Sequence, residues 1–150
     1  MITVANTVNI KNADLKLFEF GKTYHNYLAG YEEKKHMSFF LTGNRNQESW
    51  TSVQKMSNFF LFKGYVYGIL SRVGIENTQN IPVTLDVFSE RMAIKFDNET
   101  IVELGVIKKS ILKHFGIKQE VLYADFDWDL ILKKTSTKIK YAEIPKITAY

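Results

Sequence analysis

The sequence contains no cysteine, which excludes disulfide bonds, thiolate metal sites and thiol nucleophiles. It also lacks an apolar run of the length that a bilayer span needs, and residues 1–12 have neither the basic nor the apolar part of a secretory signal. Only 2 prolines and 8 glycines occur, whereas 45% of the residues are hydrophobic and 14% are aromatic, which excludes disorder. We therefore expect one soluble, cytoplasmic domain of 150 residues that buries a sizeable core and has no membrane partner.

The net charge of +4 is concentrated at the C-terminal end of the chain. Residues 133–150 carry one glutamate, Glu143, and five lysines: Lys133, Lys134, Lys138, Lys140 and Lys146. The preceding 132 residues are therefore neutral overall. Because proteins that follow a phosphate backbone gather cations on their folded surface, this distribution favours a solvated basic exit segment, residues 133–150, over a nucleic-acid-binding arm.

The pattern of apolar residues predicts an α+β domain with a mainly antiparallel sheet flanked by helices. We expect strands over 15–24, 37–42, 83–88, 92–96, 100–106 and 121–126, and a last edge strand over 139–142. The tight-turn sequence 97–99 pairs two of them as a hairpin. A loop is expected over 25–35, a long helix capped by Ser57 and ended by Gly74, and short helices over 108–115 and 127–134.

The residues that could carry chemistry form no convincing active site. Asp125, Asp127 and Asp129 alternate like the first ligands of a calcium loop, but the glycine and glutamate that complete such a loop are replaced by Leu130 and Ser136. Capping of a helix by these aspartates is therefore the preferred interpretation. The three histidines, His25, His36 and His114, have no metal-ligand spacing. The aromatic pairs 39–40 and 59–60 lack interleaved basic residues and predict core packing rather than base stacking.

Five stretches carry a resemblance to a known family, in the same order along the chain. They are residues 12–22 (NADLKLFEFGK), 59–66 (FFLFKGYV), 101–107 (IVELGVI), 120–127 (EVLYADFD) and 143–146 (EIPK). They resemble two strands, the opening of a long helix, a closing strand with its helix, and an exit segment in the beta subunit of bacterial phenylalanine–tRNA ligase. The resemblance covers nearly the whole chain.

The resemblance implies a non-catalytic copy of the class II aminoacyl-tRNA synthetase core. In that family the catalytic alpha subunit of an (αβ)₂ enzyme charges tRNA with phenylalanine, using ATP and Mg²⁺. The implied role is structural: the domain packs on the alpha subunit. The alternative is a tRNA contact through Lys133, Lys134, Lys138 and Lys140.

Departures from an active class II core support the non-catalytic interpretation. The strand over residues 15–21 offers no arginine for the α-phosphate of ATP, and Asp129 stands where the resemblance expects an arginine of the third motif. A carboxylate there would repel a triphosphate, so we expect no catalytic residue, no metal and no cofactor in this domain. The family's first motif and its later arginine-rich domain have no counterpart, so we expect residues 1–150 to be one domain of a longer polypeptide.

Overall fold

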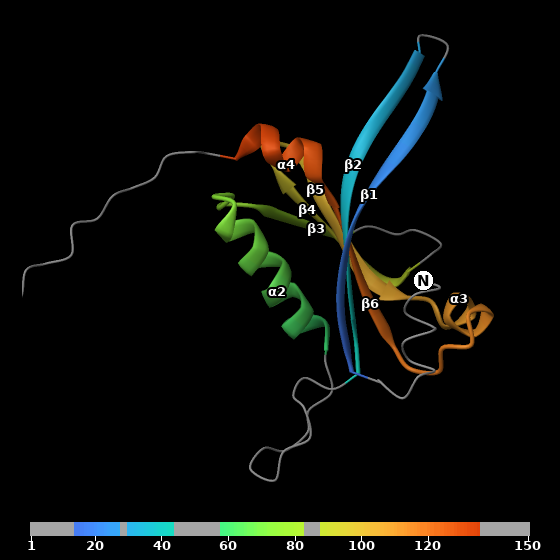
Figure 1. The fold of residues 1–150 in the computed structure, drawn as a ribbon. Helices are drawn as coiled ribbons and strands as arrows, with labels where there is room; N and C mark the ends of the chain where they lie inside the picture. Colours follow the sequence, from blue (N-terminus) through green and yellow to red (C-terminus); the bar gives the residue numbers. More distant parts are fainter. Residues whose placement is uncertain (1–13, 28–29, 44–57, 83–87, 136–150) are drawn as a thin grey trace, which may run out of the picture.

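A single antiparallel sheet forms the centre of the computed structural model, which describes residues 14–27, 30–43, 58–82 and 88–135. The order across the sheet is β1-β2-β6-β5-β4-β3 (Figure 1). The strands are β1 (Leu15–Tyr27), β2 (Gly30–Thr42), β3 (Gln79–Pro82), β4 (Phe88–Phe96), β5 (Glu99–Ile107) and β6 (Val121–Asp127). Together with the helices below, they confirm the expected α+β class.

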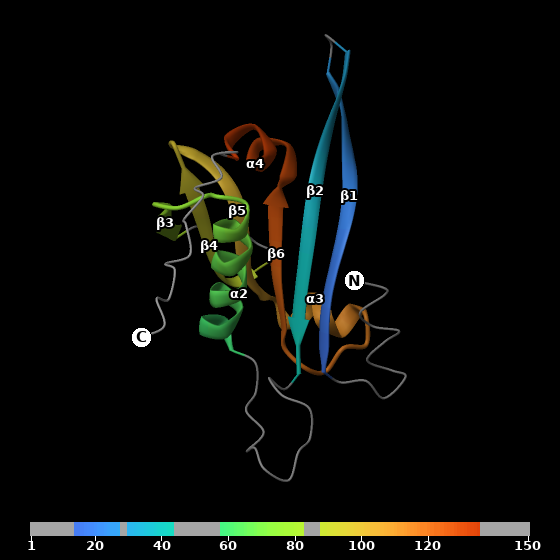
Figure 2. The ribbon, with the colours of Figure 1, turned by 60° about the vertical axis from the view of Figure 1, so that its left-hand side comes forward.

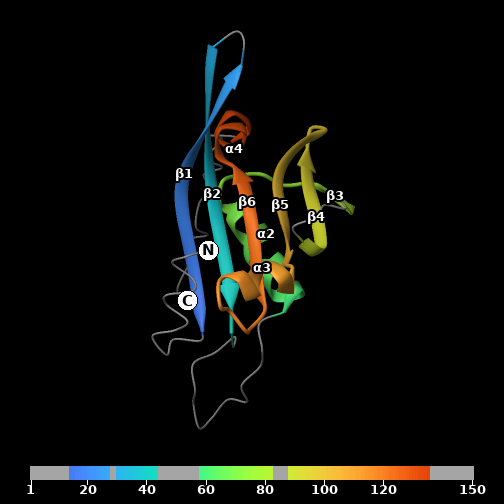
Figure 3. The ribbon, with the colours of Figure 1, turned by 90° about the vertical axis from the view of Figure 1, so that its right-hand side faces the viewer.

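Helices cover both faces of the sheet, as Figure 3 shows with α3 in front of the strands and α2 behind them. Helices α2 (Phe59–Arg72) and α4 (Trp128–Lys134) pack on one face, which we call the α2 face. Helix α3 (Lys109–His114) packs on one end of the opposite face, the α3 face. None of the described helices has the length and apolar character required to cross a membrane.

The larger core lies between α2 and the sheet. Phe62, Val66 and Leu70 of α2 recur at steps of four and are almost completely buried. The ring of Phe62 stacks on that of Phe39 from β2, with centroids 5.2 Å apart. Strand β6 contributes Leu122, Ala124 and Phe126 at alternate positions, which confirms the face assigned to them by the sequence pattern. A smaller core on the α3 face includes Phe40, Leu112 and Val121.

The ends of the helices follow local sequence signals. Helix α2 is capped by Asn58, whose side chain accepts a hydrogen bond from the backbone N–H of Leu61, so the prediction of Ser57 as the cap is wrong. Its C-terminal end is closed by Gly74 at φ +78°, with the N–H of Ile75 donating to the carbonyl of Leu70. Gly116, at φ +69°, ends α3 in the same way. The expected glycine stops are confirmed.

The predicted turn between β4 and β5 is confirmed, with Asp97 at φ +49° and Asn98 at φ +64°. Positive φ at both central residues is the type I′ geometry that suits a two-residue hairpin, and short polar side chains tolerate it. Of the expected strand over 83–88 only Phe88 lies among the described residues, where it begins β4. The predicted segment over 139–142 also falls outside the described residues.

The predicted loop over residues 25–35 is wrong. Strand β1 continues to Tyr27, and β2 begins at Gly30, so most of this segment belongs to one long hairpin. The prediction failed because both faces of this part are exposed, which leaves no alternation of apolar and polar residues.

Candidate interaction surfaces

The hairpin of β1 and β2 extends beyond the rest of the sheet (Figure 2). Strand β2 pairs with β6 only from His36 to Thr42, whereas its pairing with β1 continues to the register pair Tyr27 and Gly30. In the described structure, residues 22–27 and 30–35 therefore pair only with each other, and we call these two segments the arm. A two-stranded ribbon is at most marginally stable in water unless something else packs against it. The arm is therefore a candidate docking element.

Large aromatic side chains are exposed along this hairpin. We call the following set the aromatic stripe: Phe18 (65% exposed), Phe20 (55%), Tyr24 (66%) and Tyr31 (83%). The three from β1 occupy even positions and share a face, and Tyr31 joins them because its register partner Asn26 also has an even number. Lys22, also at an even position, separates Phe20 from Tyr24 on this face. Exposed aromatic rings gathered on one face mark interaction sites more often than isolated exposed residues do.

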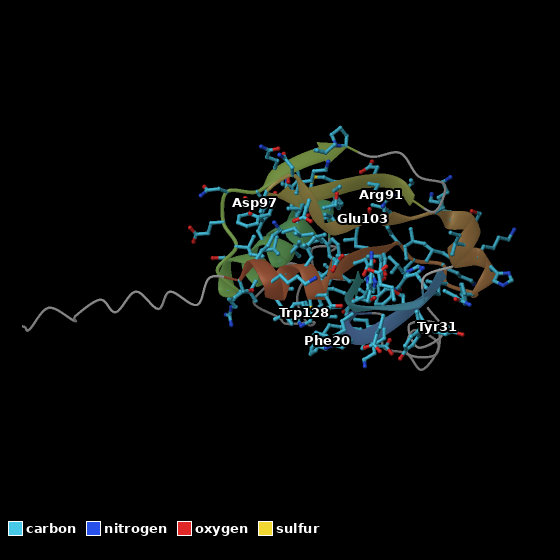
Figure 4. All side chains as sticks on the ribbon, turned by 90° about the horizontal axis from the view of Figure 1, so that it is seen from above. Phe20, Tyr31, Arg91, Asp97, Glu103 and Trp128 are labelled. Carbon is cyan, nitrogen blue, oxygen red and sulfur yellow. The ribbon has the colours of Figure 1, made fainter. Side chains whose placement is uncertain are left out.

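The stripe is anchored to the body of the domain at one end. The ring of Phe20 meets that of Trp128 at the start of α4 edge to face, with centroids 5.2 Å apart (Figure 4). The ring of Phe20 also lies edge to face with that of Phe18. Leu132, one turn further along α4, is 53% exposed. The stripe therefore continues onto α4 on the α2 face.

An ion pair joins the two strands of the arm. Lys22 Nζ lies 2.8 Å from a carboxylate oxygen of Glu33, and this hydrogen bond raises the pKa of Lys22. The sequence interpretation stopped the strand at Tyr24 and missed this element. The only signal for it in the sequence is the charge run over 32–35, which offers Glu33 as a partner for Lys22, but Lys35 lies opposite Lys22 in the register, so the charges do not fix the pairing.

A polar cluster lies on the α3 face where the arm joins β6. Thr23 Oγ1 is 3.0 Å from His36 Nε2, and His36 Nδ1 is 3.1 Å from Asp125 Oδ1. The order hydroxyl–imidazole–carboxylate resembles a nucleophilic relay. An acyl-transfer site also needs donors for a developing oxyanion, and the neighbouring side chains of Glu103 and Asp127 would repel one. The relay therefore serves to tie the arm to β6.

A second pair of polar contacts extends this cluster across the sheet. The hydroxyls of Ser38 and Tyr123 are 3.3 Å apart, and burial raises the pKa of Tyr123. On the neighbouring strands the guanidinium of Arg91 pairs with Glu103 (Figure 4). A cavity of about 260 Å³ opens here; its titratable lining residues are His25, Lys34, His36, Glu103, Asp125 and Asp127. One lysine faces three carboxylates, so the site is acidic and does not suit a triphosphate.

The structure gives each of the three alternating aspartates a separate partner. Asp125 pairs with His36, and the side chain of Asp127 caps α4 by accepting from the N–H of Leu130 at 3.0 Å. Asp129 accepts from the backbone N–H of Lys35 at 2.8 Å and so holds α4 against β2. The capping interpretation is confirmed for Asp127.

The lysines proposed for a tRNA contact are only partly described. The Nζ of Lys134 lies 2.7 Å from Glu99 and 3.3 Å from Asp97, and the hydrogen bond to Glu99 raises the pKa of Lys134. Its charge is therefore already compensated. Lys133 is exposed, whereas Lys138 and Lys140 lie outside the described residues. The role of this basic exit segment stays a prediction.

The remaining histidine and aromatic pairs lie in structural positions. His114 is the last residue of α3 and meets the ring of Phe115 edge to face. Phe39 and Phe40 belong to the two cores on opposite faces of the sheet, and Phe59 packs against the larger one. Core packing is thus confirmed for these three residues, but the prediction is wrong for Phe60, which is 85% exposed.

Comparison with known proteins places this geometry in a family context. The model of a family described as the phenylalanyl tRNA synthetase beta chain CLM domain matches residues 1–128. The chain is 35% identical over 161 residues to a phenylalanine–tRNA ligase beta subunit from Bacteroides thetaiotaomicron, covering 98% of this chain and 20% of the relative. It is 26% identical over 147 residues to that subunit from Thermotoga maritima, covering 97% and 18%. The chain spans about a fifth of the length of these curated relatives.

The fold also resembles that of a solved structure at much lower sequence identity. Pyrrolysyl-tRNA synthetase from Desulfitobacterium hafniense superposes with a TM-score of 0.64 at 10% identity. The match covers 93% of this chain and 52% of that structure. At this identity the likeness concerns the arrangement of sheet and helices alone.

Proposed function

Because the chain belongs to the family of phenylalanyl tRNA synthetase beta chain CLM domains, we propose that it is a non-catalytic assembly domain with a class II synthetase-like core. In this proposal it packs on the catalytic alpha subunit of an (αβ)₂ enzyme that charges tRNA with phenylalanine, using ATP and Mg²⁺. The arm and the aromatic stripe make the contact. The observation that carries the proposal is the exposure of four aromatic rings along the β1–β2 hairpin, two of them, Tyr24 and Tyr31, on an arm that pairs with no other described strand.

The energetics of association favour this surface over the others. Aromatic side chains are enriched at protein interfaces and dominate their binding energy, because each buries a large area and loses little conformational freedom. Tyr24 and Tyr31 contribute little to the domain's own core, since both are largely exposed. Burying them against a partner would stabilise the arm and the complex together.

The acidic cavity on the α3 face supports the non-catalytic part of the proposal. Glu103, Asp125 and Asp127 line it with a single lysine, Lys34, and the guanidinium of Arg91 is paired with Glu103. Asp129, expected at the position of a nucleotide-binding arginine, is used to hold α4 against β2. These residues do not fit ATP. Titration with Mg·ATP at millimolar concentration should give no saturable binding, and saturable binding would contradict this part of the proposal.

The assembly role is tested with a matched pair of variants and the alpha subunit from the same source. The double variant Tyr24→Ser, Tyr31→Ser removes the arm's two tyrosine rings, and Phe60→Ser removes from α2 one ring that is at least as exposed as either. We expect the dissociation constant, measured by calorimetry, to rise about 30-fold or more for the arm variant, as for loss of interface hot spots. For Phe60→Ser we expect no change. Equal effects of the two variants, or none, would refute the assignment of the interface to the arm.

The contact between tRNA and the basic exit segment is the alternative function. Replacing Lys133, Lys138 and Lys140 with glutamine would then flatten the salt dependence of tRNA binding. Lys134 is left unchanged in this test because its ion pairs with Asp97 and Glu99 join α4 to the β4–β5 hairpin.

A further inference from the structure

A cavity beside α3 lies at the opposite end of the molecule from the arm (Figure 1). Its volume is about 740 Å³, within the usual range for ligand sites. Its apolar lining consists of Val106 and Ile107 at the end of β5, Leu112 of α3, and Ile117, which follows Gly116 at the end of α3. Neither the assembly role nor the polar cluster uses this cavity.

Lysines surround this apolar floor. Lys108, Lys109, Lys113 and Lys118 line the cavity, and of the described lining residues Glu120 alone is acidic. Lys109, Lys113 and Lys118 are exposed, and no acidic side chain in the described structure lies within 4.0 Å of their ammonium groups. The charge count of the sequence did not show this patch, because acidic residues elsewhere cancel it in the sum over residues 1–132.

Clustered lysines without acidic partners are suited to phosphate groups, since each releases a counterion when it approaches one. An apolar recess beside them can take an unpaired base, which has two apolar ring faces. A base-paired duplex keeps its bases stacked and could use only the lysines. The combination therefore favours a single-stranded or looped segment of RNA over a duplex.

We propose that the α3 cavity and its lysines bind a single-stranded stretch of RNA, with the lysines on the phosphates and one unpaired base in the cavity. The curated relatives are named as tRNA ligase subunits, so an RNA partner is consistent with the family. An acidic protein segment is the competing occupant, and the experiment below separates the two. The inference does not rest on the assembly role, because the arm lies at the other end of the molecule (Figure 1).

The test uses the whole 150-residue chain and fluorescence anisotropy of a labelled single-stranded 12-nucleotide RNA of mixed sequence. The plot of log affinity against log salt has a negative slope, and in the variant Lys109→Gln, Lys113→Gln, Lys118→Gln we expect the magnitude of this slope to decrease by about 2. The affinity at 0.1 M salt should decrease about 100-fold. The control Lys16→Gln, Lys63→Gln, Arg72→Gln loses the same charge from β1 and α2. It should keep most of the affinity. Equal loss in both variants would show non-specific attraction and overturn the proposal.

Two further measurements test whether a base enters the cavity and which kind of partner binds there. Ser110 lines the cavity from the exposed side of α3, so Ser110→Leu should obstruct the cavity and lower the affinity for single-stranded RNA about 10-fold, without changing the salt slope. Unchanged affinity would overturn the base-binding part. Displacement of the RNA by poly-glutamate at equal charge concentration would identify an acidic protein segment instead. Displacement by AMP at the same nucleotide concentration would identify a free nucleotide, and either result would overturn the assignment to an RNA strand.

Discussion

Two phenylalanines on the first turn of α2 provide a direct test of how the fold is stabilised. Phe62 is completely buried and stacks on Phe39, whereas Phe60, two residues earlier on the same helix, is 85% exposed. Replacing Phe62 with alanine removes its transfer free energy, leaves a cavity and removes the ring stacking, which together cost about 4 kcal/mol. Replacing Phe60 with alanine should change the free energy of unfolding by less than about 0.5 kcal/mol.

Urea unfolding followed by circular dichroism measures both effects. With a slope of about 2 kcal/mol per molar urea, the midpoint should fall by about 2 M for Phe62→Ala and by less than about 0.3 M for Phe60→Ala. If Phe62→Ala is unfolded in water, Phe62→Leu keeps most of the volume and should show a smaller decrease in the same direction. Similar shifts for the two alanine variants would refute the packing of α2 on the sheet described above.

Further predictions concern local geometry and pH. Gly64→Ala should stabilise the domain by about 0.8 kcal/mol, because Gly64 lies inside a helix and an added Cβ meets open space. Gly116→Ala should destabilise it by about 1 kcal/mol, because the φ of Gly116 is +69°. Thermal unfolding of the two variants measures both effects. Asp127→Ala should cost about 1 kcal/mol by removing the cap of α4, with faster amide exchange in that helix. Burial raises the pKa of Tyr123 in the folded state, so the unfolded state loses this proton first and stability should fall as the pH rises above about 10. Tyr123→Phe should make the decrease in stability at alkaline pH smaller, as measured by the urea midpoint at a series of pH values. The same decrease in the variant and the parent protein would contradict the role of burial.

The elements that the sequence predicted well are those in which one face is buried. The α2 helix and β6 show clear periodicity because each presents apolar residues to the core, and Gly74 and Gly116 mark helix ends by their conformation. The arm was missed for the opposite reason. Both of its faces meet solvent, so its strands are held by backbone pairing and by the ion pair of Lys22 with Glu33. These interactions depend on a partner strand that local pattern analysis does not identify.

The candidate surfaces were harder to predict because they combine distant parts of the chain. The lysines beside α3 are separated in the sequence from the acids that cancel them in a charge count, and only the fold segregates the two. The relay of Thr23, His36 and Asp125 joins three strands, and nothing in the spacing of these residues along the chain indicates it. The three alternating aspartates over residues 125–129 could be recognised from the sequence. The capping role of Asp127 could be predicted because a helix was expected to begin there.

Hydrogen–deuterium exchange of the chain with and without the alpha subunit tests the assembly role most directly. Alone, the amides of the arm should exchange fast, because residues 22–27 and 30–35 pair only with each other in the described structure. With saturating alpha subunit, the arm and the start of α4 should become protected, while the amides of α2 stay unchanged. A stable complex in which the arm exchanges as fast as before would contradict the account.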